Sequence, residues 1–391
     1  MDSEYDGKDE KMAERTQVKQ KKALILLPYL KNGDGTAVAL MNYYQELIEH
    51  GWRIDFLVLK IFECEWLNKV KADGNNIYEL PKENKYSYKV SRKIRSIIKE
   101  GKYDIVHVNM PGHVGFETLK MARQYGIGKR IFHAHNPRNN LNLKTVISTK
   151  VYDYLLQREA TELVACSKSA GNSRFGNKDF QVLKNVIDTD RFVYRLGGRG
   201  FYREDRRYIR EKLHIEKKVV VGVVGRFAAQ KNPEFLLECF AEYNKLNKES
   251  VLLWIGDGEL QEKIQDRAKN MGLKGACLFV GRKNNIEKWY SAMDLFLLPS
   301  KFEGMGIVFL EAQCTGLPCF GSTNVPIETE VTELMHRISL KQEANYWATA
   351  MKKVTDMSGD RRSRASEFIN AGYTHEATKS DLLNMYEKRI K

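Results

Sequence analysis

The chain has 391 residues, of which 42% are hydrophobic and 29% charged, and a formal net charge of +14. This length exceeds what one hydrophobic core usually serves, so we expect a soluble globular protein of two domains. No apolar run reaches the roughly 18 residues of a membrane-spanning helix, and the charged N-terminus has no apolar core that would suit a secretory signal.

The basic charge and the cysteines narrow the possible partners. Residues 1–195 hold 33 Lys and Arg against 24 Asp and Glu. Nucleic acid, an anionic membrane or a polyanionic substrate would fit this excess, but the chain has no nucleic-acid-binding motif, which disfavours nucleic acid.

The six cysteines form no Cys-x-x-Cys pair. We therefore predict reduced thiols in a cytoplasmic protein without a zinc site.

The first half follows a strand–helix–strand pattern. Residues 1–22 are predicted to be a disordered charged tail. The apolar run 23–28 predicts a buried strand, and a glycine-containing turn leads into a helix over 36–49. Strands are expected to recur near residues 53–59, 77–80, 104–108, 130–135, 162–166 and 181–186, with helices between them. This alternation predicts a parallel, doubly wound sheet.

Residues 86–100 predict an amphipathic, basic helix. Val90, Ile94, Ile97 and Ile98 form one apolar stripe, and several of the other positions hold lysine or arginine. The stripe can pack on the sheet, as in an ordinary surface helix. Alternatively, it can lie on an anionic membrane surface.

Two histidines follow one of the predicted strands. Alternation along a strand places His133 and His135 on the same side, at the sheet edge where such proteins bind ligands. No third ligand at useful spacing supports a metal site. A histidine at this edge can donate a hydrogen bond to a substrate oxygen, and a purely structural histidine is the alternative.

Asp188-Thr189-Asp190 formally matches an Asp-x-Asp metal signature. The motif lies at the end of the first predicted domain, where aspartates more often form turns or cap helices. We therefore interpret it as a turn.

The second half begins a new sheet after a charged, glycine-containing segment. Residues 219–224 predict its first strand, and Arg226 and Lys231 follow Gly225 at the carboxyl end of that strand. Two cations there can clamp a diphosphate and stabilise it as a leaving group. A surface Arg and Lys without a role is the alternative.

The most informative stretch runs from residue 295 to residue 319. It predicts a buried strand, a glycine loop and then an apolar helix whose N-terminus forms a place for an anion. Glu303 and Glu311 lie on either side of that place. They can hold hydroxyls on both sides of a diphosphate, whereas a hydrolytic pair would have to lie about 5–9.5 Å apart across a glycosidic bond. The alternative is that both glutamates are exposed to solvent and have no function.

The strings EGMG at 303–306, EA at 311–312 and GLP at 316–318 resemble the signature of the family 4 retaining glycosyltransferases, which have the GT-B fold. Met305 stands where the family usually has Phe. Asp34 replaces the first of two usual glycines, so only Gly35 is carried over as phosphate-binding. The family also implies that His135 approaches the donor sugar and that the nucleotide base lies near Arg282.

This resemblance implies both a site and an architecture. The expected catalytic residues are Glu303, His135, Arg226 and Lys231. The expected donor-binding residues are Gly35, Gly225, Arg226, Lys231, Arg282, Glu303, Gly304, Met305, Gly306 and Glu311. We expect an α/β protein with two Rossmann-like, doubly wound domains and an interdomain cleft. The expected parts are an acceptor domain at 23–195, a linker at 196–217, a nucleotide-sugar domain at 218–370 and a last helix within 371–391 that crosses back.

The expected function is transfer of a sugar, with retention, from a nucleotide diphosphate donor such as a UDP-sugar. The resemblance points to capsular or exopolysaccharide synthesis, with a lipid-linked oligosaccharide as acceptor at the inner face of the plasma membrane. We expect neither a metal nor another cofactor. A nucleotide-sugar epimerase and a catalytically silent partner of a glycosyltransferase are the alternatives.

Overall fold

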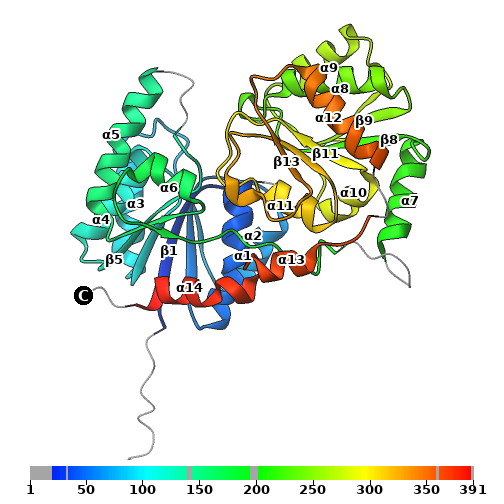
Figure 1. The fold of residues 1–391 in the computed structure, drawn as a ribbon. Coiled ribbons are helices and arrows are strands. Elements are labelled where there is room, and N and C mark those ends of the chain that lie inside the picture. Colours follow the sequence, from blue (N-terminus) through cyan, green and yellow to red (C-terminus); the bar gives the residue numbers. More distant parts are fainter. Residues whose placement is uncertain (1–19, 32–33, 139–142, 194–200, 358–360, 389–391) are drawn as a thin grey trace, which may run out of the picture.

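The computed structural model describes residues 20–31, 34–138, 143–193, 201–357 and 361–388. These residues form two α/β units that lie side by side (Figure 1). The tail predicted for residues 1–22 lies outside the described residues up to residue 19, and Lys22 already begins the first strand. The predicted α/β class with two doubly wound parallel sheets is confirmed.

The first domain is built on a parallel sheet with the strand order β3-β2-β1-β4-β5-β6-β7. Its strands are nearly continuous apolar runs, because helices cover both faces of a parallel sheet. They are β1 (Lys22–Leu30), β2 (Arg53–Ile61), β3 (Ile77–Glu79), β4 (Ile105–Val108), β5 (Lys129–Ala134), β6 (Glu162–Ala165) and β7 (Gln181–Val182). The helices are α1 (Gly35–Glu49), α2 (Glu65–Ala72), α3 (Tyr88–Gly101), α4 (His113–Gln124), α5 (Leu143–Glu159) and α6 (Lys168–Phe175).

The second domain repeats this plan with the strand order β10-β9-β8-β11-β12-β13. Its strands are β8 (Val219–Val224), β9 (Ser250–Ile255), β10 (Cys277–Phe279), β11 (Leu295–Leu298), β12 (Cys319–Ser322) and β13 (Met335–Ile338). Its helices are α8 (Pro233–Leu246), α9 (Gln261–Asn270), α10 (Ile286–Ala292), α11 (Ile307–Cys314), α12 (Ala344–Met357) and α13 (Ala365–Asn370), with 3-10 turns η1 (Ala229–Lys231) and η2 (Ile327–Thr329).

Strand order reverses once in each sheet, at β1/β4 and at β8/β11. Loops that leave neighbouring strands at such a point diverge to opposite faces, and a crevice opens beyond the carboxyl ends of the strands. The loops after β1, β5, β8 and β11 are those that carry most of the predicted site residues.

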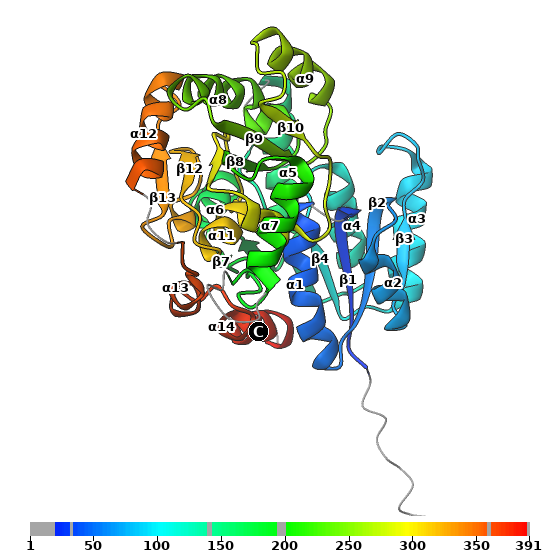
Figure 2. The same cartoon turned by 90° about the vertical axis from the view of Figure 1, so that its right-hand side faces the viewer.

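The segment that we predicted as a linker, 196–217, is largely a helix. This helix, α7 (Phe201–Leu213), lies on the outer side of the second domain (Figure 2). Arg206 bonds the side chain of Asp294 at 2.6 Å and Arg210 also pairs with it, while both donate to backbone carbonyls near Met293. These bonds attach α7 to the second sheet, so most of the segment belongs to the second domain.

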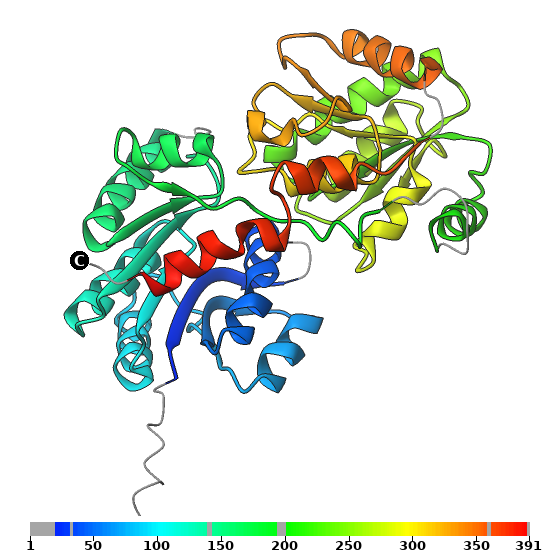
Figure 3. The ribbon, with the colours of Figure 1, turned by 60° about the horizontal axis from the view of Figure 1, so that its bottom comes forward.

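The last helix, α14 (His375–Glu387), lies along the first domain (Figure 3). Leu382, Met385 and Tyr386 join the apolar core around α1 and β1. The Lys129 ammonium of β5 donates to the carbonyls of Met385 and Lys388 at 2.6 and 2.7 Å. The helix dipole favours a cation at this C-terminal end. Because α14 follows the second domain in the chain and packs on the first, the two domains are joined at a second point.

Candidate active site

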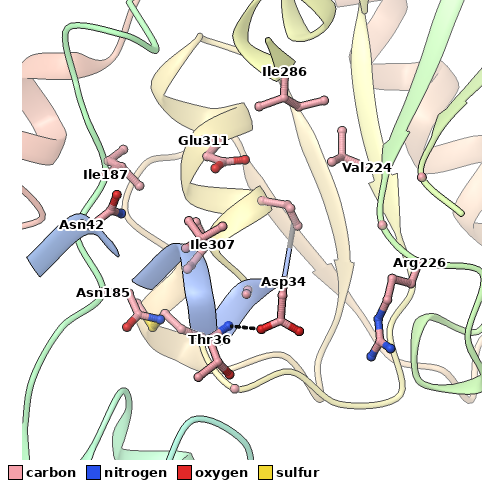
Figure 4. Close-up of a pocket in the computed structure, with 18 of the residues that line it drawn as sticks. Asp34, Thr36, Asn42, Asn185, Ile187, Val224, Arg226, Ile286, Ile307 and Glu311 are labelled. Carbon is pink, nitrogen blue, oxygen red and sulfur yellow. Dashed lines mark hydrogen bonds between the residues drawn. The ribbon is translucent and has the colours of Figure 1, made fainter. Parts of the chain in front are cut away.

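A cavity of about 400 Å³ lies between the carboxyl edges of the two sheets (Figure 4). Residues from both domains line it. We call one side the first-domain wall, which includes Asp34, Thr36, Glu65, Trp66, His135 and Asn185. The opposite side is the second-domain wall, which includes Gly225, Arg226, Lys231, Arg282, Glu303 and Glu311. The structure thus brings the predicted site residues together at one cavity.

The start of the second-domain wall is fixed by close backbone contacts. The Trp254 indole donates to the Gly225 carbonyl at 3.1 Å. A Cβ at Gly256, which has a φ of +147°, would lie 2.1 Å from that same carbonyl. Only glycine allows this approach, and it holds the loop from which Arg226 extends into the cavity (Figure 4). Arg226 forms no salt bridge with any described residue.

Lys231 and Glu303, which we predicted to act on different parts of the donor, contact each other. The Lys231 ammonium donates to Glu303 Oε1 at 2.6 Å, and the Ser300 hydroxyl donates to the same oxygen at 2.5 Å. Glu303 is only 5% exposed. A buried carboxylate needs such partners, so Lys231 and Ser300 hold Glu303 in place.

The loop after Glu303 brings the two walls into contact. A Cβ on Gly304 would lie 1.7 Å from the His135 carbonyl oxygen, and the Ser167 hydroxyl donates to the Gly304 carbonyl at 2.7 Å. Met305 is buried. Gly306, with a φ of +75°, precedes α11 and offers no side chain to cap the helix. The first amide groups of α11 are therefore left for an anion.

Glu311 lies one helical turn farther along α11. Its carboxylate accepts a hydrogen bond from the Tyr290 hydroxyl at 2.8 Å. Burial raises the pKa of Glu311 to about 7, against the opposing effects of Tyr290 and the Arg191 guanidinium. Glu311 is therefore a hydrogen-bond acceptor at the cavity wall whose charge changes near pH 7.

Arg282, which we placed near the nucleotide base, forms an ion pair with Asp257. This hydrogen bond lowers the pKa of Asp257. Asp257 lies between Gly256 and Gly258, and a Cβ on Gly258 would lie 2.7 Å from backbone atoms of Phe227. The pair thus stands on a rigid turn at the cavity edge.

On the first-domain wall, His135 is oriented by Asn109. The Asn109 amide nitrogen bonds the His107 carbonyl at 3.3 Å, which leaves its Oδ1 to meet His135 Nε2 at 2.8 Å. His135 Nε2 must then carry the proton. Burial lowers the pKa of His135 to about 3, so the ring is neutral and its Nδ1 is an acceptor. We had expected the ring to donate to substrate, and the geometry differs from that expectation.

A chain of aromatic side chains lies behind His135. The His133 and His135 ring centroids are 4.0 Å apart. His133 Nδ1 lies 3.2 Å from His107 Nε2, and His107 Nδ1 lies 2.9 Å from the Tyr386 hydroxyl of α14. The last helix therefore supports the loop that carries His135 from behind, which no local sequence pattern indicates.

Asp34, which replaces a glycine of the family pattern, caps α1. Its Oδ1 accepts from the amides of Thr36 and Ala37, both at 3.1 Å. Gly35 lies beside it at the cavity wall. The carboxylate occupies the helix amides that a phosphate would need.

Other residues at the cavity were not singled out as site residues from the sequence. They include Trp66, Asn185, Arg191 and Asp257. Only their position after predicted strands, or in a glycine turn, could have indicated them. Asp188 accepts from the Arg191 amide at 3.0 Å, as in the turn that we predicted. Among the described residues no group of His, Cys, Asp and Glu has the arrangement of a metal site.

Comparison with known families assigns both halves of the chain. Residues 33–191 match the family described as Glycosyltransferase Family 4, and residues 205–375 match Glycosyl transferases group 1. The chain is 28% identical over 380 residues to EpsF of Bacillus subtilis (strain 168), covering 94% of this chain and 96% of EpsF. It is 32% identical over 284 residues to an Escherichia coli UDP-Gal:alpha-D-GlcNAc-diphosphoundecaprenol alpha-1,3-galactosyltransferase, covering 66% and 68%.

Solved structures show the same fold. HepE of Anabaena, determined with UDP and glucose, has a TM-score of 0.77 at 15% identity and covers 94% of this chain and 100% of HepE. WaaG, a glycosyltransferase involved in lipopolysaccharide biosynthesis, has a TM-score of 0.69 at 18% identity and covers 94% and 98%. These likenesses, together with the two parallel sheets, confirm the GT-B architecture.

Proposed function

Because the chain belongs to the family 4 glycosyltransferases, we propose that it transfers a hexosyl group from a UDP-sugar to a lipid-linked oligosaccharide, with retention of configuration. Capsular or exopolysaccharide synthesis is the proposed pathway. The similarity to the Escherichia coli galactosyltransferase, whose name includes a UDP-sugar and a diphosphoundecaprenol acceptor, supports both substrates.

One observation carries the donor assignment. The second-domain wall presents, around one cavity, an acceptor at Glu311, the open N-terminus of α11, the paired Lys231–Glu303 and Arg226, which has no salt bridge to a described residue. This arrangement suits a ribose, a diphosphate and a sugar in succession. Ribose hydroxyls would donate to Glu311, and the diphosphate would lie against Arg226 and the helix amides.

In the proposed reaction the bond between the anomeric carbon and the diphosphate oxygen breaks as the acceptor oxygen bonds that carbon. The proton of the acceptor hydroxyl leaves with the diphosphate, which Arg226, Lys231 and α11 stabilise as an anion. Glu303 stabilises the positive charge that develops on the sugar. His135 Nδ1 accepts a hydrogen bond from a substrate hydroxyl. With three sources of positive potential on this chain, we propose that no divalent metal is needed.

The direct test is turnover with a panel of UDP-sugars. Purified protein, with and without a short-chain lipid-diphosphate sugar, is assayed for UDP release, for the anomeric configuration of the product by NMR, and for loss of activity in EDTA. Acceptor-dependent UDP release with retained configuration in EDTA supports the proposal. A new epimer without UDP release would indicate an epimerase, and UDP-sugar binding without any turnover would indicate a silent partner.

We also propose that the first domain lies on the anionic inner face of the plasma membrane. The predicted apolar stripe of α3 is buried in the core, so the exposed side of α3 carries mainly basic residues, including Lys89, Arg92 and Lys93, together with Tyr88. On α5, however, Ile147, Val151 and Tyr154 are 57%, 51% and 57% exposed at helical spacing. Helix α4 lies between α3 and α5 on the same face (Figure 1). No described helix is long and apolar enough to cross a membrane.

Vesicle sedimentation tests this membrane surface. Each basic residue near an anionic surface contributes about 1 kcal/mol, screened over about 8 Å at physiological salt. We expect salt-sensitive binding to anionic vesicles that is lost in an Ile147→Glu/Tyr154→Glu variant. Tyr208→Glu on α7, a change at a 61% exposed tyrosine, is the matched control and should bind as the parent does. Equal binding to neutral vesicles would contradict the proposal.

A further inference from the structure

The two walls of the cavity differ in charge. Among the described lining residues that precede residue 194, Arg191 is the one cation, and it pairs with Glu287 of the second domain at 2.8 Å. The same wall carries the carboxylates Asp34, Glu65 and Asp188 together with Trp66. Such a surface repels phosphate and suits a neutral ligand with hydroxyl groups and an apolar ring face.

The α1 terminus does not alter this conclusion. The amides of Thr36 and Ala37 are already bonded to Asp34 Oδ1, and a bound phosphate would lie beside that carboxylate. The wall therefore has hydrogen-bonding groups but no open anion site next to Thr36.

Asn185 is a polar side chain on this wall that lacks a hydrogen-bond partner. It is 4% exposed, and its Oδ1 is buried without a hydrogen-bond partner among the described residues. It lines the cavity on the same side as Thr36 (Figure 4). A buried acceptor without a donor costs about 1–3 kcal/mol, so such a group indicates a ligand that supplies the donor.

The backbone around Asn185 is held on three sides. The Tyr43 hydroxyl donates to the carbonyl of Lys184, and the Asn42 amide donates to that of Val186 at 2.9 Å. The Ile187 amide donates to the Tyr373 carbonyl at 3.0 Å. The unsatisfied oxygen is thus on a rigid support, as a specificity-determining group requires.

We propose that Asn185 binds a hydroxyl of the acceptor's terminal sugar, which occupies the first-domain wall as a neutral ring. This inference rests on the proposed function and deepens it. The lipid diphosphate of the acceptor then lies outside this wall, because the wall is acidic. Asn185 acts as a specificity-determining residue for the acceptor and not for the donor.

Saccharide binding tests this subsite without requiring turnover. Protein saturated with UDP is titrated with methyl α-glycosides of glucose, galactose and N-acetylglucosamine, followed by saturation-transfer NMR. The parent should bind at least one of them, and Asn185→Ala should bind it about tenfold more weakly, as for one lost buried hydrogen bond. Its UDP affinity and its Tm should not fall, because an unsatisfied group has been removed.

Asn75→Ala is the matched control. Asn75 is 6% exposed, but it accepts from the Ile54 amide at 3.1 Å and donates to Tyr44 at 2.8 Å. This variant should lose Tm and keep its saccharide affinity. The proposal is overturned if the parent binds no glycoside or if Asn185→Ala also weakens UDP binding. It is overturned as well if Asn185→Ala has a lower Tm while its saccharide affinity is unchanged. Saccharide binding without UDP release from any UDP-sugar would instead overturn the proposed function alone.

Discussion

Two helices point their N-termini at the same cavity, and their chemistry is opposite. Helix α11 begins after Gly306, which has no side chain to cap the amides. Helix α1 begins after Asp34, whose carboxylate bonds two of its amides. Both helix dipoles favour negative charge, but at α1 the protein itself supplies that charge. A single cap residue therefore decides whether a helix end is a site for a phosphate or part of a wall for hydroxyls.

The surroundings of the two helices follow the same division. Arg226 and Lys231 stand near α11, whereas carboxylates and Trp66 stand near α1. The nucleotide diphosphate is therefore expected against the second domain alone. Four changes, in order of expected effect, test this division.

Glu303→Gln should have the largest effect, because Glu303 faces the reacting sugar in the reaction that we propose. We expect kcat to fall about 10²–10³-fold, the usual cost of one electrostatic group at a transition state. UDP affinity, measured by calorimetry, should stay near that of the parent, since the diphosphate contacts remain. A variant that turns over like the parent would show that the reaction does not occur at this wall.

Gly304→Ala should separate the two walls. Its Cβ would lie 1.7 Å from the His135 carbonyl oxygen, so the loop that carries Glu303 and Gly304 must move. A displacement of about 1 Å can cost 10²-fold, and we expect a loss of that order in kcat/KM with UDP binding retained. Gly128→Ala, where a Cβ meets nothing within 4 Å, is the control and should keep full activity. Normal turnover in Gly304→Ala would mean that the walls need not touch.

Glu311→Gln should weaken donor binding more than it slows the chemical step. A hydrogen bond to a charged group contributes about 1.5–3 kcal/mol, so the KM for the donor should rise about 10–150-fold while kcat changes little. If diphosphate affinity is unchanged, Glu311 does not hold the ribose.

The same residue predicts a pH dependence. The pKa of Glu311 is raised to about 7, so the carboxyl is neutral below that pH and becomes the stronger, charged acceptor above it. UDP affinity should therefore rise through pH 7 in the parent. Glu311→Gln lacks this contribution and is the control for the titration of UDP itself, which affects both proteins equally.

Asp34→Gly should have the smallest effect and sharpens the comparison most. Loss of an N-cap costs about 1 kcal/mol when Ala replaces it and only a few tenths when Gly does, so Asp34→Ala should lower Tm by about 2–4 °C. Asp34→Gly opens the α1 amides, and added sulfate should then raise its Tm more than it raises that of the parent. An equal response to sulfate would show that the capped and open termini do not differ as described.

The two parallel sheets and the loops around the candidate site could be predicted from the sequence. Apolar runs and glycine turns mark the strands, and the strings around Glu303 and Glu311 mark the donor loop, because secondary structure and turn chemistry are local properties. Boundaries were less certain. The strand predicted at 181–186 is only Gln181–Val182. The Leu183 amide still bonds β6, but the backbone after it bonds α1 and Tyr373 instead of the sheet.

Which side chains contact each other could not be predicted from the sequence. Lys231 and Glu303 are 72 residues apart in the chain, and Asn109 and His135 are 26 apart. No local pattern indicates that Lys231 pairs with Glu303 or that His135 is left as an acceptor. Nor can a sequence show that Asn185 lacks a partner. A hydrogen-bond partner, or its absence, depends on the packing of segments that are distant in the chain, and that packing exists only once both sheets have formed and the two walls have closed on each other.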